Sequence, residues 1–419
     1  MKADFAVINA GQLVTVAGYS RRPKRGPELD ELGIIKDGAV AAKDGLIVAA
    51  GPTDEVMRQV ELADALVIDA GGKVVLPGLV DPHTHLVFAG TREDEFEMKI
   101  KGAAYLDILA RGGGILSTVR STRAAGEEEL IRIGRKYLAE MLSQGTTAAE
   151  VKSGYGLTVA DELKQLRAIR ALQEAQPVDL VPTFLGAHAI PEEYRENSEA
   201  FVDLVIGEML PAVAASDLAE CCDIFCEEGV FSIEQSRRVL QEARRLGFKL
   251  KLHADEIVPL GGAELAVEMG ALSADHLVAV SPRGIEKLAA SNTVAVLLPA
   301  TTFCLMGDKY APAREMIAAG VAVALASDFN PGSSPVNSLP VVMGIACRQL
   351  KMTPAEAISA VTINAAHAIG RASQLGSIEA GKKCDLVIFD AADYRAIAYR
   401  FGTNLVDKVI KAGRLVIGG

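Results

Sequence analysis

The chain has 419 residues, of which 50% are hydrophobic and 23% charged, with a net charge of −11. This length is more than one small domain needs. The acidic balance and the lack of a dense Lys/Arg cluster argue against a nucleic-acid-binding protein. No uncharged apolar run is long enough to span a membrane, and the N-terminus lacks the features of a signal peptide.

Both ends of the chain carry short alternating strands. Residues 4–16 and 35–70 alternate apolar and polar side chains around a turn at Lys43-Asp44-Gly45, and residues 384–389 form a similar segment. We expect these segments to build one small antiparallel β domain, a composite β-sandwich of residues 1–74 and 374–419.

The central part of the chain alternates apolar strands with amphipathic helices. Eight apolar runs are predicted strands: residues 74–80, 146–151, 180–185, 220–226, 249–252, 272–274, 293–298 and 321–326. Helical periodicity lies between them, for example at residues 127–144, 160–175, 233–246 and 262–269. Repeated strand–helix units with continuously apolar strands indicate an α/β fold, a TIM-like (β/α)8 barrel, at residues 75–373.

The first of these strands runs into Asp81-Pro82-His83-Thr84-His85. Side chains alternate faces along a strand, so His83 and His85 point the same way. Two adjacent imidazoles at the end of a buried strand are half of a divalent-metal site. Five of the six histidines of the chain fall at the ends of apolar runs, which weakens the alternative of two histidines in a polar turn.

Later strands also end in side chains able to bind metals or transfer protons. Catalytic residues of (β/α)8 barrels lie at the carboxyl ends of the strands. His253, His276 and Asp328 follow the fifth, sixth and eighth predicted strands, and Glu256 lies three residues after His253. A carboxylate at position 256 can move the proton of an attacking water, and His276 can bind that water or polarise a carbonyl.

Together, the first-strand histidines, His253 and Asp328 form a nitrogen and oxygen ligand set. Such a set suits zinc, with iron as the alternative. Cys221, Cys222 and Cys226 are a second candidate set, but they lack a CxxC pair, and we interpret them as core residues. The six cysteines show no disulfide spacing, so we expect a cytoplasmic protein.

This order of strand-end residues resembles the amidohydrolase superfamily, as does the segment 375–382 leading into the strand after it. Many members of that superfamily bridge two metal ions with a modified lysine at the end of the fourth strand. Here the fourth strand ends in Cys226-Glu227-Glu228. The resemblance therefore implies one metal ion per chain, Zn²⁺ or else Fe³⁺, held by His83, His85, His253 and Asp328.

Within the superfamily, several segments resemble the enzymes of histidine degradation that hydrolyse a cyclic amide carrying a propionate. These segments are residues 81–90 with Arg92, 153–157, 184–188, 253–256, 273–277 and 327–332. The resemblance implies hydrolysis of the ring C–N bond of 4-imidazolone-5-propanoate to N-formimidoyl-L-glutamate. It also implies that Glu256, His276 and Asp328 are catalytic.

The same resemblance implies a substrate-binding set: Arg92, Tyr155, His188, Glu256, Asn330, Gly332 and Ser333. An arginine can grip a carboxylate in a bidentate fork. A structural turn is the alternative interpretation of residues 330–333, and Lys152 is interpreted as an ion-pair partner.

Two other functions stay open on the sequence alone. A heterocyclic deaminase would use the same ligand set with its His-x-x-Glu sequence, and a non-catalytic barrel would serve as an interaction scaffold. Arg92 favours an acidic substrate over a nucleobase. We expect a small-molecule substrate, no nucleic-acid or membrane partner, and a homodimer.

Overall fold

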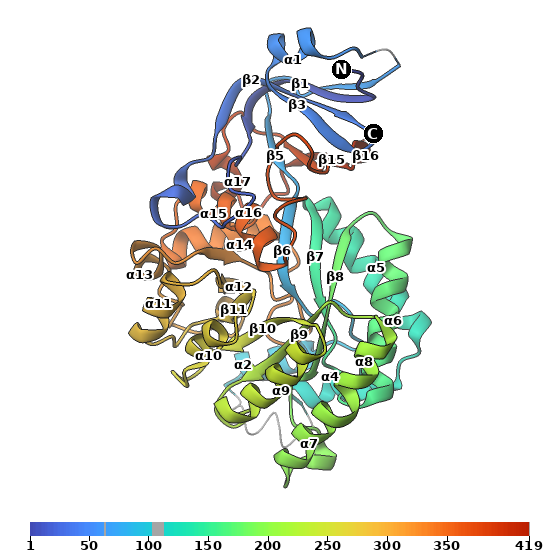
Figure 1. The fold of residues 1–419 in the computed structure, drawn as a ribbon, viewed down its shortest axis with the longest axis vertical. Helices are drawn as coiled ribbons and strands as arrows, with labels where there is room; N and C mark the ends of the chain where they lie inside the picture. Colours follow the sequence, from blue (N-terminus) through green and yellow to red (C-terminus); the bar gives the residue numbers. More distant parts are fainter. Residues whose placement is uncertain (63, 103–112, 419) are drawn as a thin grey trace.

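The computed structural model describes residues 1–62, 64–102 and 113–418. Figure 1 shows a sheet-rich part, to which both termini belong, standing above a barrel of strands surrounded by helices. The predicted combination of an eight-stranded parallel barrel with a β domain built from both ends of the chain is confirmed. In the part of the chain that the structure describes, no helix combines the length and the apolar character needed to cross a bilayer.

The composite domain is one hydrogen-bonded sheet in the order β16-β15-β14-β5-β1-β2-β3, with β4 also paired to β1. Its strands are β1 (Phe5–Val14), β2 (Ile34–Lys43), β3 (Leu46–Pro52), β4 (Leu66–Asp69), β5 (Val74–Pro77), β14 (Leu386–Phe389), β15 (Val406–Lys411) and β16 (Arg414–Ile417). Apolar residues from both ends of the chain, among them Phe5, Val40 and Leu386, pack into a core that belongs to this domain.

The expectation of a purely antiparallel sheet was wrong. Strand β1 pairs in parallel with β4 and with β5, so the sheet is mixed. Parallel strands need a crossover connection, and helix α1 (Thr53–Gln59) provides one between β3 and β4. The predicted turn does form the β2–β3 hairpin, where Asp44 and Gly45 have φ values of 51° and 79°. These left-handed conformations explain the Asp-Gly pair.

The barrel strands follow one another around the barrel in chain order. They are β6 (Leu79–Thr84), β7 (Thr146–Lys152), β8 (Asp179–Ala187), β9 (Cys221–Cys226), β10 (Lys249–Ala254), β11 (Ser273–His276), β12 (Val294–Leu297) and β13 (Val323–Leu325). The ring closes between its first strand and the segment after its last. There the Asp328 N–H donates to the His83 carbonyl at 3.0 Å, and the His85 N–H donates to the Phe329 carbonyl at 2.9 Å.

Helices occupy most of the connections between barrel strands and also the last part of the barrel domain. They are α2 (Glu93–Ile100), α4 (Ile115–Ala124), α5 (Glu127–Ser143), α6 (Val159–Ala175), α7 (Ser198–Leu204), α8 (Leu210–Ser216), α9 (Ile233–Arg245), α10 (Gly262–Glu268), α11 (Pro282–Ala289), α12 (Pro299–Cys304), α13 (Ala313–Ala318), α14 (Leu339–Ile345), α15 (Pro354–Ala360) and α16 (Ile363–Ala368). A final helix, α17 (Arg395–Tyr399), lies between β14 and β15.

The apolar run at residues 74–80 forms two strands, where the sequence predicted one. Val74–Pro77 pairs with β1 and β14 in the composite sheet, whereas Leu79–Thr84 pairs with β7 in the barrel. Gly78 separates them, and a Cβ atom there would lie 2.1 Å from Thr147 Oγ1. We therefore propose that the boundary between the composite domain and the barrel domain lies at this glycine.

Candidate active site

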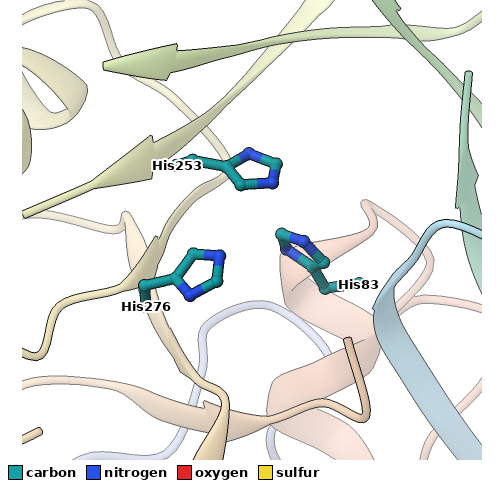
Figure 2. A group of neighbouring side chains, drawn as sticks. All are labelled: His83, His253 and His276. Atoms are coloured by element: carbon teal, nitrogen blue, oxygen red, sulfur yellow. The ribbon is translucent and has the colours of Figure 1, made fainter. Parts of the chain in front are cut away.

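Three histidine rings from three barrel strands face one another inside the barrel (Figure 2). His83 belongs to β6, His253 to β10, and His276 ends β11. The ring centroids are 4.5 Å apart for His83 and His253, 5.1 Å for His253 and His276, and 5.4 Å for His83 and His276. All three residues are buried. The barrel thus brings together histidines that are far apart in the sequence.

His85 and Asp328 complete this cluster. The Nε2 atoms of His83 and His85 are 3.2 Å apart, and each lies 3.4 Å from Asp328 Oδ1. The other carboxylate oxygen, Oδ2, accepts a hydrogen bond of 2.7 Å from the Thr301 hydroxyl. Asp328 has a φ of 53°, a left-handed conformation that is uncommon for residues other than glycine and is often found at functional sites.

The donor atoms of this cluster fit a metal ion. Among the described residues, both ring nitrogens of His253 and Nε2 of His276 have no hydrogen-bond partner, although they are buried. Leaving buried polar atoms unpaired is costly unless a ligand satisfies them. Three overlapping groups have ligand atoms within 4.8 Å of one another, namely His83-His85-Asp328, His83-His253-His276 and His85-His188-His253.

The protonation states also suit metal binding. Burial lowers the pKa of His83 to about 3 and that of His85 to about 4. Burial alone would raise the pKa of Asp328, but the neighbouring His83 and His85 hold it well below its usual range. Two neutral imidazoles and a carboxylate are the forms in which these groups bind metals.

Two buried carboxylates, those of Asp275 and Asp223, contact histidines of the cluster. The sequence analysis assigned a role to neither of them. Asp275 Oδ2 lies 2.6 Å from His83 Nδ1, and Asp223 Oδ2 lies 3.0 Å from His253 Nδ1. Carboxylates in this position orient metal-binding imidazoles. The sequence signal was an aspartate inside an otherwise apolar strand, as in Cys221–Cys226.

Glu256 lies just beyond the end of β10, with its side chain 20% exposed. Its Oε1 is 3.6 Å from His276 Nδ1. Burial raises the pKa of Glu256, against the opposing effect of His276. Glu227 secures this loop, because its carboxylate accepts the N–H groups of Ile257 at 2.9 Å and Val258 at 3.2 Å. Glu256 is thus a mostly buried carboxyl group beside the histidine cluster, where it can accept and donate protons as a general acid–base group.

Arg92 precedes α2 and lines a cavity of about 810 Å³ together with Asn330 and Gly332. Its Nε and Nη2 atoms donate to Glu95 Oε2 at 3.0 and 2.9 Å. Its Nη1 atom lies so near Gly332 that a Cβ atom there would be 1.8 Å away. Glu95, a residue that the sequence did not single out, therefore fixes the orientation of this guanidinium.

Tyr155 and His188 lie beside the cluster. The His188 ring stacks on the His85 ring with centroids 4.7 Å apart and planes at 12°, and the Tyr155 ring is 5.3 Å from that of His188. Burial raises the pKa of Tyr155, with the charges of Asp328 and Arg92 acting in opposite directions on its hydroxyl. Tyr155 is thus within electrostatic reach of both Asp328 and Arg92, and His188 lies against His85 of the cluster.

The contacts of Asn330 are those of a structural turn. Its amide nitrogen donates to the Asp328 carbonyl at 2.7 Å and to the Ser333 hydroxyl at 2.8 Å. Its amide oxygen accepts the N–H groups of Gly332 and Ser333, both at 2.8 Å. Asn330 therefore shapes the loop after β13, and its contact with substrate stays a prediction.

A family model described as "Amidohydrolase family" matches residues 74–416. The chain therefore belongs to the amidohydrolase family, as the strand-end residues predicted, and it is a hydrolase. It is 55% identical over 418 residues to the imidazolonepropionase of Alkaliphilus oremlandii (strain OhILAs), covering 100% of this chain and 99% of the relative. It is 53% identical to the imidazolonepropionase of Symbiobacterium thermophilum, covering 99% and 97% of the two chains.

Solved structures share the fold at low sequence identity. A triazine hydrolase variant matches with a TM-score of 0.75 and 18% identity, covering 99% of this chain and 94% of the other. The guanine deaminase of E. coli matches with a TM-score of 0.73 and 16% identity, covering 99% of each chain. At these identities the likeness concerns the architecture alone.

Proposed function

We propose that this chain hydrolyses the C–N amide bond of 4-imidazolone-5-propanoate, giving N-formimidoyl-L-glutamate. The observation that carries the proposal is that Arg92 lies against Gly332, in the loop that follows Asp328, so that a guanidinium accompanies the metal-capable cluster of which Asp328 is a member. The full-length likeness to imidazolonepropionases supports the same substrate.

We propose that one metal ion, zinc or iron, would be held by His83, His85, His253 and Asp328. Such an ion supplies Lewis acidity, which lowers the pKa of water toward neutrality and polarises a carbonyl. Thr301, which donates to Asp328, and Asp275, which lies against His83, would keep these ligands in place.

Glu256 is the proposed acid–base group. With its carboxylate beside the cluster, it can take a proton from the water that attacks the ring carbonyl carbon. The C–N bond then breaks, and Glu256 returns the proton to the ring nitrogen that leaves. His276, 3.6 Å from Glu256, can donate a hydrogen bond to the carbonyl oxygen as negative charge develops there.

Arg92 is the proposed partner of the propionate. A guanidinium binds a carboxylate with charge-assisted hydrogen bonds, and Nη1, unlike Nε and Nη2, is not held by Glu95. Tyr155 and His188 would contact the ring of the substrate, because both lie beside His85 of the histidine cluster. Gly332 and Ser333 would approach the substrate from the loop after β13.

We also propose that the protein works as a homodimer in the cytoplasm.

The proposal is tested by following the metal-loaded chain with imidazolone propionate by proton NMR, with a parallel assay for ammonia. Ring opening to N-formimidoyl-L-glutamate without release of ammonia is the expected result. Ammonia released in step with loss of substrate would instead support the deaminase alternative. No turnover despite bound metal would contradict the proposed substrate.

A further inference from the structure

We propose that Lys152 is a positioning residue for the metal centre, acting through the two carboxylates that hold His83 and His253. The inference rests on the metal site proposed above. It gives a role to a lysine that the sequence analysis interpreted only as an ion-pair partner.

Lys152 ends strand β7 and is completely buried. Its Nζ atom lies 2.8 Å from Glu150 Oε1, 2.7 Å from Asp223 Oδ2 and 3.9 Å from Asp275 Oδ2. All three carboxylates belong to fully buried residues. The ammonium group of Lys152 therefore lies among three buried carboxylates inside the barrel.

Each of the two aspartates also contacts one histidine of the cluster. Asp275 Oδ2 is 2.6 Å from His83 Nδ1. Asp223 Oδ2 is 3.0 Å from His253 Nδ1, while Asp223 Oδ1 accepts the backbone N–H of His253 at 3.2 Å. A single carboxylate group therefore separates Lys152 from each of two proposed metal ligands, His83 and His253, which belong to opposite strands of the barrel.

This arrangement decides which ring nitrogen faces the metal. At His83 a hydrogen bond between Nδ1 and Asp275, and at His253 the charge of Asp223 3.0 Å from Nδ1, favour the ring orientation in which Nε2 faces the ion. Carboxylates this close together in a dry interior repel one another unless a cation lies among them. Without the ammonium group, Asp223 and Asp275 would shift, and the rings that they hold would lose their fixed orientation.

A second buried lysine, Lys251, does not replace Lys152. Lys251 Nζ donates to the Ser273 hydroxyl at 2.7 Å and lies 3.6 Å from Asp275 Oδ2. Its ion-pair contacts in the described chain do not extend to Asp223 or Glu150. Lys152 is thus the cation that links the carboxylate behind His83 to the carboxylate behind His253.

The test compares Lys152→Met with Lys382→Met, measuring metal release to a chelator and thermal unfolding of the full chain. Lys382 is a matched control, because it is buried to a similar degree and binds the Ala372 and Leu375 carbonyls at 2.6 and 3.1 Å, outside the barrel interior. We expect Lys152→Met to release metal about 10–100-fold faster than the unsubstituted chain. Lys382→Met should lower the unfolding temperature without changing the release rate.

A second readout is the visible absorption spectrum of the Co²⁺-loaded chain, which reports ligand geometry independently of turnover. A changed spectrum for Lys152→Met and an unchanged one for Lys382→Met supports the inference. If Lys152→Met does not fold, Glu150→Gln/Lys152→Gln is used, since it leaves the net charge of these buried side chains as it is. Faster metal release from that double variant than from Glu150→Gln alone also supports the inference.

Equal release rates and spectra for the Lys152 variants and the unsubstituted chain would overturn the inference while leaving the proposed function intact. An unsubstituted chain that binds no metal would instead overturn the proposed function, and the inference with it. The two failures are therefore distinguishable in one set of measurements.

Discussion

The guanidinium of Arg92 lies directly against the backbone of Gly332, so that a Cβ atom on that glycine would come within 1.8 Å of Nη1. No side chain fits at position 332 while the arginine keeps its place. The absence of a side chain at this position therefore determines where the proposed substrate anchor sits.

Gly332→Ala should therefore impair substrate binding without removing the metal. The methyl group displaces the guanidinium, and losing a charge-assisted hydrogen bond costs about 1.5–3 kcal/mol, which corresponds to roughly a 10–150-fold rise in KM. Steady-state kinetics and metal analysis check this. Gly126→Ala is the control, because a Cβ atom there meets open space. A normal KM for Gly332→Ala would contradict the proposed position of Arg92.

Arg92→Ala should raise KM for the propionate substrate by a similar factor, and kcat should fall if the anchor also aligns the ring. The substitution should matter much less for a ring analogue without the carboxylate. Lys99→Ala is the matched control, since Lys99 lines the same cavity. If Arg92→Ala impaired both substrates equally, Arg92 would not be the group that binds the carboxylate. If Lys99→Ala raised KM for the propionate substrate more than Arg92→Ala did, Lys99 would be that group.

Glu256→Gln should retain the metal and lose about 10²–10⁴-fold in turnover, the usual contribution of a positioned acid–base group. Metal analysis and single-turnover measurements check this. Loss of metal together with activity would make Glu256 a ligand or a folding residue. Nearly normal turnover with metal retained would assign the proton transfer to another group, with His276 or Asp328 as the candidates.

The pH dependence of kcat/KM should also identify Glu256 as the acid–base group. Burial raises the pKa of Glu256 above its ordinary value of 4.5, so the carboxyl keeps its proton to a higher pH than a solvent-exposed glutamate. Because the reaction needs the ionised form to accept a proton, kcat/KM should fall as the pH drops through this raised pKa. The measured profile should have its acidic limb above 4.5, and the limb should be absent from the residual activity of Glu256→Gln.

Metal analysis should find one equivalent per chain, and prolonged chelation should abolish turnover, which readdition of zinc or iron restores. Asp328→Ala should lower the metal content because it removes the carboxylate that both His83 and His85 face at 3.4 Å. Two equivalents of tightly bound metal, or a fully loaded Asp328→Ala chain, would contradict the proposed ligand set.

The sequence by itself determined the barrel and the composition of its site. Continuous apolar runs separated by amphipathic helices have few solutions other than a parallel barrel, and in such a barrel every strand ends on the same side. His83, His253 and His276 could therefore be assigned to one site from their positions at strand ends alone. Their convergence in Figure 2 follows from that topology.

Only the tertiary structure decided which groups hold these histidines in place. Whether Asp223 faces His253, or Lys152 reaches Asp223, depends on the register between neighbouring strands and on side-chain packing, which local periodicity does not encode. The division of residues 74–80 into two strands at Gly78 could not be predicted from the sequence for a related reason. Both halves are equally apolar, and only the pairing partners, β14 on one side and β7 on the other, assign them to different domains.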